Sequence, residues 1–201
     1  WRMAKLAFYT FAVLEKAFRH QHSRGFVDRI TGVFESAEQA SRFVGRADSA
    51  RHEGQDAQWG DPLATPRLNA RQRDARRDNS PEVSPDDHEA ATLSLWDDLE
   101  SVYAFAYYGR HAEALKKRED WFVKPEWPSF VAWWVENGQI PTWEDACSRL
   151  ELLNDEGSTP HAFDFKTPLD SAGTPWRMDR SKIQEKSDRV KMFDENNPTG
   201  I

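Results

Sequence analysis

The 201-residue chain has little of three things: cysteine, long apolar runs and positive charge. Its single cysteine, Cys147, excludes an intrachain disulfide and therefore a secreted disulfide scaffold. No apolar run approaches the roughly 18 residues of a membrane span, and the first residues lack the features of a signal peptide. With 27 Lys and Arg against 34 Asp and Glu, the net charge of −7 disfavours binding to nucleic acids or anionic membranes. We therefore expect a soluble, cytoplasmic protein that binds neither nucleic acid nor membrane.

Sequence motifs for common cofactors are also missing. The chain has no Gly-rich phosphate loop, no Cys-based zinc spacing and no serine nucleophile elbow. The run Asp86–Glu89 contains metal-ligand residue types, but it lies in an expected loop that offers no helical or strand scaffold. We therefore expect no nucleotide cofactor and no metal site.

Aromatic residues are abundant instead, with 9 Trp, 12 Phe and 4 Tyr at a hydrophobic content of only 38%. The low content comes from two segments: residues 48–90 hold 10 hydrophobic residues in 43, and residues 170–201 hold 8 in 32. Segments this polar bury too little surface to offset their ordering entropy. We predict one domain over residues 3–170, with a polar loop or disordered insertion at 48–90 and a C-terminal extension at 171–201.

The hydrophobic pattern predicts alternating strands and helices. Short apolar or alternating runs predict strands at 3–9, 42–47, 91–96, 130–135 and 161–166, and spacings of three and four predict helices at 26–37, 97–107, 110–122 and 142–157. Asp97 and Glu100 have the spacing of a capping pair at the start of the second helix. This order predicts an α+β domain with a ferredoxin-like arrangement of its first two thirds.

Several separated motifs resemble one uncharacterised domain family. They are LSLW (Leu93–Trp96), REDWF (Arg118–Phe122), AWWVENGQIPT (Ala132–Thr142) and AFDFKTPL (Ala162–Leu169), beside that family's LSVW, RREWF, LWWVPAGHIPT and AFTF. The family is placed in the dimeric α/β-barrel superfamily, with antibiotic-biosynthesis monooxygenases, polyketide cyclases and haem-binding proteins as relatives. The resemblance implies a ferredoxin-like antiparallel sheet with helices on one face, and two protomers whose sheets meet face to face.

The same resemblance implies a homodimer, because a sheet with one bare apolar face would expose a large patch in a monomer. The chain departs from the family pattern at Gln139, where the family has His, and at Gly45, where it has Trp. The insertion and the tail also exceed that pattern, and they resemble the elaborations of a eukaryotic, fungal-like member.

His111 is the leading catalytic candidate. If the helix continues past Gly109, Tyr103, Tyr107 and His111 lie on one face at steps of four. An imidazole beside a phenol among aromatic residues can take and return a proton, so we predict His111 and Tyr107 as catalytic and Tyr103 as substrate-binding. The alternative is a histidine that caps a broken helix or bonds a backbone carbonyl.

Tryptophans and arginines are the other predicted substrate-binding residues. Trp133 and Trp134 must point to opposite faces of their strand, so one at most shares a cavity wall with Trp96. The alternative for each Trp is a place in the core. Arg110 and Arg118 have guanidinium groups that could hold a carboxylate or enolate. The alternative for both is an ion pair within their own helix, with Glu113, Glu119 or Asp120.

These residues predict a cofactor-independent enzyme that cyclises, isomerises, dehydrates or oxygenates a hydrophobic natural-product intermediate in secondary metabolism. His111 is its expected general acid or base, in an aromatic cavity. Two alternatives remain at this point. One is a haem protein with His111 as the axial ligand, and the other is a non-catalytic dimer that binds a hydrophobic ligand or serves in stress response.

Overall fold

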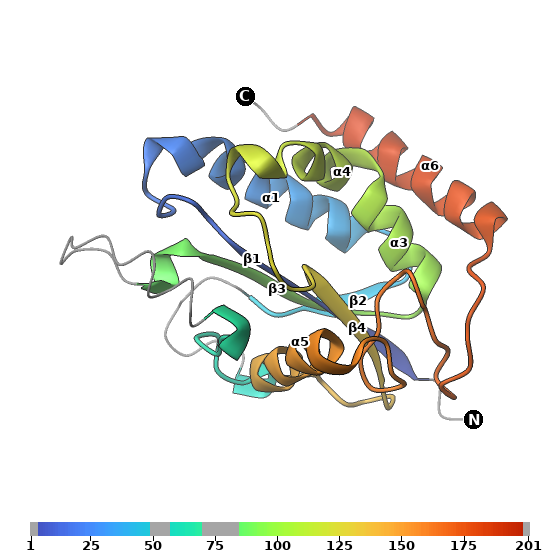
Figure 1. The fold of residues 1–201 in the computed structure, drawn as a ribbon. Coiled ribbons are helices and arrows are strands. Elements are labelled where there is room, and N and C mark those ends of the chain that lie inside the picture. The colour runs from blue at the N-terminus through green and yellow to red at the C-terminus, as the bar shows by residue number, and fades with distance from the viewer. Residues whose placement is uncertain (1–3, 49–56, 70–84, 199–201) are drawn as a thin grey trace.

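A four-stranded antiparallel sheet forms the centre of the protein. The computed structural model describes residues 4–48, 57–69 and 85–198. The strands are β1 (Lys5–Val13), β2 (Phe43–Arg46), β3 (Glu89–Trp96) and β4 (Phe130–Val135), in the spatial order β2-β3-β1-β4 (Figure 1). The α+β class and the first four predicted strands are therefore confirmed.

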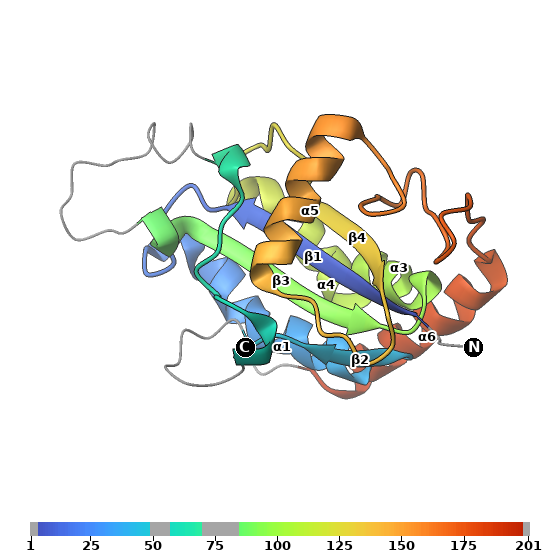
Figure 2. The same cartoon turned by 90° about the horizontal axis from the view of Figure 1, so that it is seen from below.

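Helices cover both faces of this sheet. α1 (Arg24–Gln39), α3 (Leu99–Tyr107), α4 (Gly109–Lys116) and α6 (Arg180–Asn196) lie on one face, and α5 (Trp143–Glu156) lies on the other (Figures 1 and 2). Short 3-10 turns are formed by Gln21–Ser23, Ala57–Trp59, Arg67–Asn69, Pro85–His88 and Arg118–Asp120. In the described part of the chain, none of the helices has the length and apolar character needed to cross a membrane.

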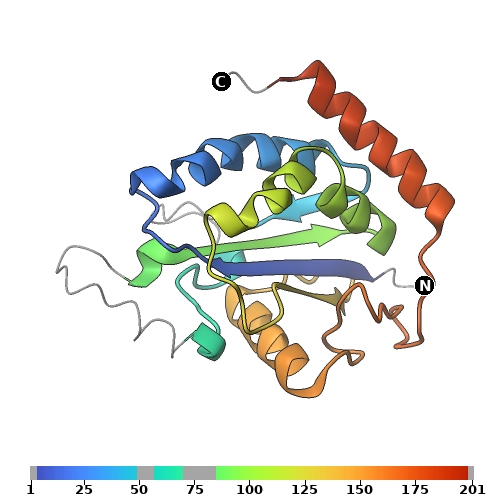
Figure 3. The ribbon, with the colours of Figure 1, turned by 45° about the horizontal axis from the view of Figure 1, so that its top comes forward.

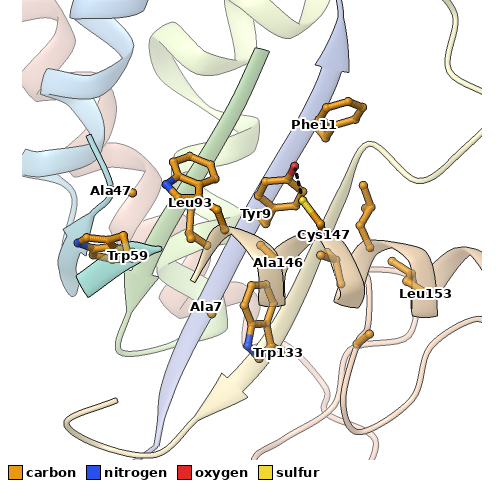
Figure 4. Packing of buried hydrophobic residues seen from close by; sticks show 14 of the residues in the cluster. Ala7, Tyr9, Phe11, Ala47, Trp59, Leu93, Trp133, Ala146, Cys147 and Leu153 are labelled. Carbon is orange, nitrogen blue, oxygen red and sulfur yellow. Dashed lines mark hydrogen bonds between the residues drawn. The ribbon is translucent and has the colours of Figure 1, made fainter. Parts of the chain in front are cut away.

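Alternation along β1 divides the core into two clusters. Leu6 and Phe8 pack under α1 and α3, whereas Ala7, Tyr9 and Phe11 pack on the opposite face. This opposite cluster joins the sheet to the buried stripe of α5 at residues 143, 146, 147, 150 and 153, as Figure 4 shows in part.

The prediction of helices on one face is wrong, because the stripe of α5 closes the second face of the sheet. Tyr9 contacts Trp143 edge-on, with ring centroids 6.2 Å apart, and its hydroxyl lies 3.8 Å from Cys147 Sγ (Figure 4). The bare apolar face from which the homodimer was argued is therefore not present.

Part of the predicted insertion also packs on this side. Trp59 is only 5% exposed and joins the α5 cluster together with Ala64 and Leu68. The backbone N–H of Asp61 donates to Glu144 of α5 at 3.0 Å. Residues 57–69 are thus ordered against α5, and β3 begins at Glu89, inside the predicted insertion. Residues 49–56 and 70–84 lie outside the described part.

The predicted strand at 161–166 is reduced to two isolated bridges, Ala132 with Phe163 and Thr159 with Ala162. Phe163 and Ala132 exchange two backbone hydrogen bonds of 2.9 Å at the outer edge of β4. The Asp164 carboxylate then accepts the N–H groups of Lys166 and Thr167, which turns the chain away from the sheet.

Candidate functional site

A cavity of about 60 Å³ lies between the sheet and the helices α1, α3 and α4. Phe8, Phe43, Trp96 and Phe105 supply much of its apolar wall. Its polar lining comes from different elements and consists of Thr10 (β1), Arg46 (β2), Thr92 and Ser94 (β3) and His111 (α4). An apolar enclosure with a few polar groups is the usual form of a small-molecule site.

Two threonines face each other across β1 and β3 at this cavity. Thr10 and Thr92 are paired in the strand register, and their Oγ1 atoms lie 2.6 Å apart. In such a pair one hydroxyl donates to the other, and the accepting hydroxyl keeps its own hydrogen. One hydroxyl hydrogen is therefore left over for a ligand.

Ser94 is occupied by the protein itself. Its Oγ donates to the Phe8 carbonyl at 3.3 Å and accepts from Trp96 Nε1 at 2.9 Å. Trp96 is fully buried, stacks on Phe105 and meets Phe43 edge-on, with ring centroids 5.4 and 5.1 Å away. Ser94 thus fixes the indole of Trp96 as a cavity wall, which is the placement predicted for Trp96.

His111 lines the cavity in one definite tautomer. Its Nδ1 lies 2.8 Å from the Ala106 carbonyl, which can only accept, so Nδ1 carries the hydrogen. Burial lowers the pKa of His111, against the opposing effect of the Ala106 hydrogen bond. The neutral ring therefore presents Nε2 as an acceptor, and Nε2 has no hydrogen-bond partner among the described residues.

Tyr103 and Tyr107 do not lie beside His111. The helix on which their alignment depended ends at Tyr107, because Tyr108 is extended and Gly109 has a φ of +62°. The two tyrosines instead contact each other, with ring centroids 4.7 Å apart, and both contact Phe165. Burial and the neighbouring Tyr103 raise the pKa of Tyr107, which is 42% exposed. The predicted pair of His111 and Tyr107 is therefore not formed.

The two neighbouring tryptophans point to opposite faces, as predicted, and neither lines the cavity. Trp133 is 1% exposed in the α5 cluster, and its Nε1 has no partner in the described structure. Trp134 lies on the face covered by α1 and α3 and donates from Nε1 to the Leu169 carbonyl at 2.9 Å. Both have the core placement that was the alternative for each.

The two predicted arginines also lie away from the cavity lining. Arg110 forms ion pairs with Asp194 at 3.5 Å and Glu35 at 3.8 Å, rather than with an acid of its own helix. Arg118 is exposed in a 3-10 turn, where its carbonyl accepts from Phe122 at 2.8 Å. Neither guanidinium is placed to hold a ligand in this cavity.

Four polar residues of the site were not predicted: Thr10, Arg46, Thr92 and Ser94. The alternation of residues 91–96 puts Thr92 and Ser94 on the same face of the strand as Trp96. Polar residues two apart on the face of a buried Trp were the available signal. Across the residues that the structure describes, no group of three or more His, Cys, Asp or Glu is placed to hold a metal ion.

Fold and site together define an α+β protein with an antiparallel sheet and a small, partly polar cavity under its helices. Residues 5–179 match the family described as Domain of unknown function (DUF3291), and the chain belongs to this family. Comparison with curated proteins and with solved structures gave no significant match.

Proposed function

We propose that this protein is a cofactor-independent enzyme that removes a proton from a small hydrophobic carbonyl compound, with His111 as the general base. The observation that carries the proposal is the state of His111. Its pKa is lowered, its Nδ1 hydrogen is held by the Ala106 carbonyl, and Nε2 is left as an acceptor at an apolar cavity. A neutral imidazole in a fixed tautomer is suited to take a proton from a substrate carbon or hydroxyl.

The threonine pair supports the carbonyl as the bound group. One hydroxyl hydrogen of the Thr10–Thr92 pair is not used within the pair and can be donated to a ligand. A donor beside a carbonyl oxygen stabilises the enolate that forms when a proton leaves the neighbouring carbon. Isomerisation, dehydration and aldol-type cyclisation of carbonyl compounds can each begin with such a proton transfer. In this proposal Trp96 and Phe105 hold the apolar part of the substrate.

Cavity size limits the substrate. A volume of about 60 Å³ is well below the roughly 300 to 1,000 Å³ of pockets that enclose drug-sized ligands. The cavity therefore accepts the reacting end of a substrate, or a small whole molecule. A haem macrocycle does not fit this volume, so the alternative with His111 as a haem ligand is disfavoured.

The strand order β4-β1-β3-β2 and the antiparallel pairing fit a ferredoxin-like fold, and they support the proposed place in the dimeric α/β-barrel superfamily. The homodimer stays a proposal. It has to use a surface other than the second face of the sheet, because α5 packs there.

Deuterium exchange tests the proposal without knowledge of the natural substrate. Small cyclic ketones, enones and 1,3-dicarbonyl compounds are incubated with the protein in D₂O, and deuterium uptake is followed by mass spectrometry. We expect at least one compound to exchange faster than in buffer, and His111→Gln to lower that rate by about 10² to 10⁴-fold. Amide shifts at Thr10 and Thr92 report binding separately from exchange.

The matched control is His161→Gln, which changes an exposed histidine outside the cavity lining. This variant should exchange at the wild-type rate. Equal rates for His111→Gln and wild type would remove the role of His111. Shifts at Thr10 and Thr92 without exchange of any compound would instead support a non-catalytic binder of small carbonyl compounds.

A further inference from the structure

Helix α6 lies along α3 and α4 and packs on the break between them (Figure 3). His111 is the third residue of α4, directly after this break. Gly109 at this break is in the left-handed region, with φ +62°. A Cβ on Gly109 would meet Val190 Cγ1 of α6 at 2.8 Å and would collide with the Asp194 carboxylate. Lys191 of the same helix lies over the ring of Tyr108, 5.1 Å from its centroid. α6 therefore closes tightly around the break.

Asp194 supplies the N-terminal cap that α4 does not obtain from its own residues. Tyr108 stands at the N-cap position of α4 and makes no side-chain cap hydrogen bond. The N–H of Arg110 donates to Asp194 Oδ2 at 2.8 Å instead. A carboxylate at a helix N-terminus both satisfies an unpaired N–H and interacts favourably with the helix dipole. Because His111 is the next residue, this cap fixes the backbone that carries the imidazole.

The Arg110 side chain extends the same connection to a third helix. Its Nε lies 3.5 Å from Asp194 Oδ1, an ion pair without hydrogen-bond geometry, and its guanidinium donates to the carbonyls of Asp194 and Asn197. It also donates to the Gly32 carbonyl of α1 at 3.3 Å. The Arg110 and Asp194 side chains are only 13% and 10% exposed. Removing Asp194 leaves the Arg110 guanidinium with the more exposed Glu35 as its ion-pair partner, and removing Arg110 leaves the largely buried Asp194 carboxylate without its ion-pair partner.

The start of α6 is anchored to α3. Glu100 is 3% exposed and accepts from Trp176 Nε1 at 3.2 Å and from the N–H of Asp179 at 3.0 Å. Lys186 donates to Ser101 Oγ at 2.8 Å. These contacts hold α6 along its length, so Asp194 reaches α4 from a supported helix.

We propose that α6 is a clamp on the candidate site and that Asp194 is a positioning residue for His111. The clamp acts through the cap on Arg110, which holds the first turn of α4 against the cavity. The inference rests on the proposed function of His111 for its effect on catalysis. Residues 180–196 lie beyond the family match to 5–179, so the clamp is formed by a helix outside the matched region.

NMR of ¹⁵N-histidine-labelled full-length protein tests the clamp directly. In wild type we expect His111 with hydrogen on Nδ1, a lowered pKa and a protected Arg110 amide. Asp194→Ala should expose the Arg110 amide to exchange, shift the His111 pKa toward its ordinary value and mix its tautomers. Deuterium exchange of a carbonyl probe should fall by about 10²-fold if the imidazole moves by 1 Å. Asp194→Asn keeps an acceptor for the Arg110 N–H and should restore most of the wild-type His111 spectrum.

The control is Glu185→Ala, which removes an exposed carboxylate of the same helix that pairs with Arg189. It should leave the His111 spectrum unchanged. If Asp194→Ala does not fold, Asp194→Asn and Lys186→Ala are the variants to compare. Across these variants, a larger loss of Arg110 amide protection must accompany a larger change in the His111 spectrum. Lost protection at Arg110 with an unchanged His111 spectrum would overturn the clamp. A changed spectrum in a protein that exchanges no probe supports the clamp and removes only the catalytic role.

Discussion

Gly109→Ala should destabilise the protein by about 2–4 kcal/mol. An L-residue in the left-handed region costs about 1–2 kcal/mol, and Gly109 has a φ of +62°. The new methyl group also displaces the Asp194 carboxylate and presses on Val190. Losing the cap that Asp194 gives to Arg110 costs about another 1 kcal/mol, and up to 2.

Gly138→Ala is the matched control for this change. Gly138 also has a positive φ, of +87°, but a Cβ there has no atom within 4 Å. It therefore measures the backbone cost alone, about 1–2 kcal/mol. The difference between the two variants, about 1–2 kcal/mol, is the contribution of the contact with α6.

Urea unfolding followed by tryptophan fluorescence gives both values, and thermal melts give a second measure. For a chain of this length each kcal/mol corresponds to a shift of about 2–4 °C in Tm. Gly109→Ala should thus melt several degrees below Gly138→Ala. Equal destabilisation of the two variants would refute the claim that α6 is held against the α3–α4 break.

Three further experiments test the cavity and the cluster that packs against α5. Thr10→Val should cost about 1–2 kcal/mol because it leaves the Thr92 hydroxyl unpaired, whereas the double valine variant should be near neutral, and a double-mutant cycle in urea measures this coupling. The folded-state pKa of His111 is below the unfolded 6.5, so its neutral form contributes stability above pH 6.5 that is lost on acidification. His111→Gln should therefore lose less stability than wild type between pH 7 and 5, and parallel pH profiles would contradict this. Burial raises the pKa of Cys147 to about 11, so a thiol reagent at pH 8 should label it only on unfolding, and rapid labelling of native protein would show an open α5 face.

Much of the fold was predictable because its apolar residues follow regular periods. The strand at 130–135 and the helix opened by Thr142 and closed by Gly157 were predicted at their observed ends. The cap of α3 was misplaced by one residue, since Asp98 rather than Asp97 accepts from Ser101 at 2.8 Å. The expected capping partner, Glu100, instead accepts hydrogen bonds from Trp176 and Asp179 of the C-terminal segment.

Helix α6 was missed because its buried face is short of apolar residues. Only Ile183, Ser187 and Val190 are buried along its 17 residues, and polar contacts hold the rest. A periodicity of hydrophobic residues cannot reveal a helix whose position depends on salt bridges and caps from other elements. The segment was therefore predicted only as a polar C-terminal extension at 171–201.

The candidate site was half predictable for a related reason. His111 and Trp96, predicted as catalytic and substrate-binding, both line the cavity, but Tyr103 and Tyr107 were assigned to the face of His111 on the condition that the helix continues. Gly109 breaks that helix in a left-handed conformation, and the segment that packs against the break, α6, is distant in sequence. Thr10 and Thr92 were missed because their pairing depends on strand register, which a single sequence does not specify.

The anchoring of Asp179 and Trp176 on the buried Glu100 carboxylate has a practical consequence for domain boundaries. The family match ends at residue 179, yet that residue donates to Glu100, and the helix that follows buries Ile183 and Val190. A fragment trimmed to the family limits would expose an apolar strip of α3 and lose the cap of α4. The packed unit therefore extends to Asn196, about five helical turns beyond the matched region.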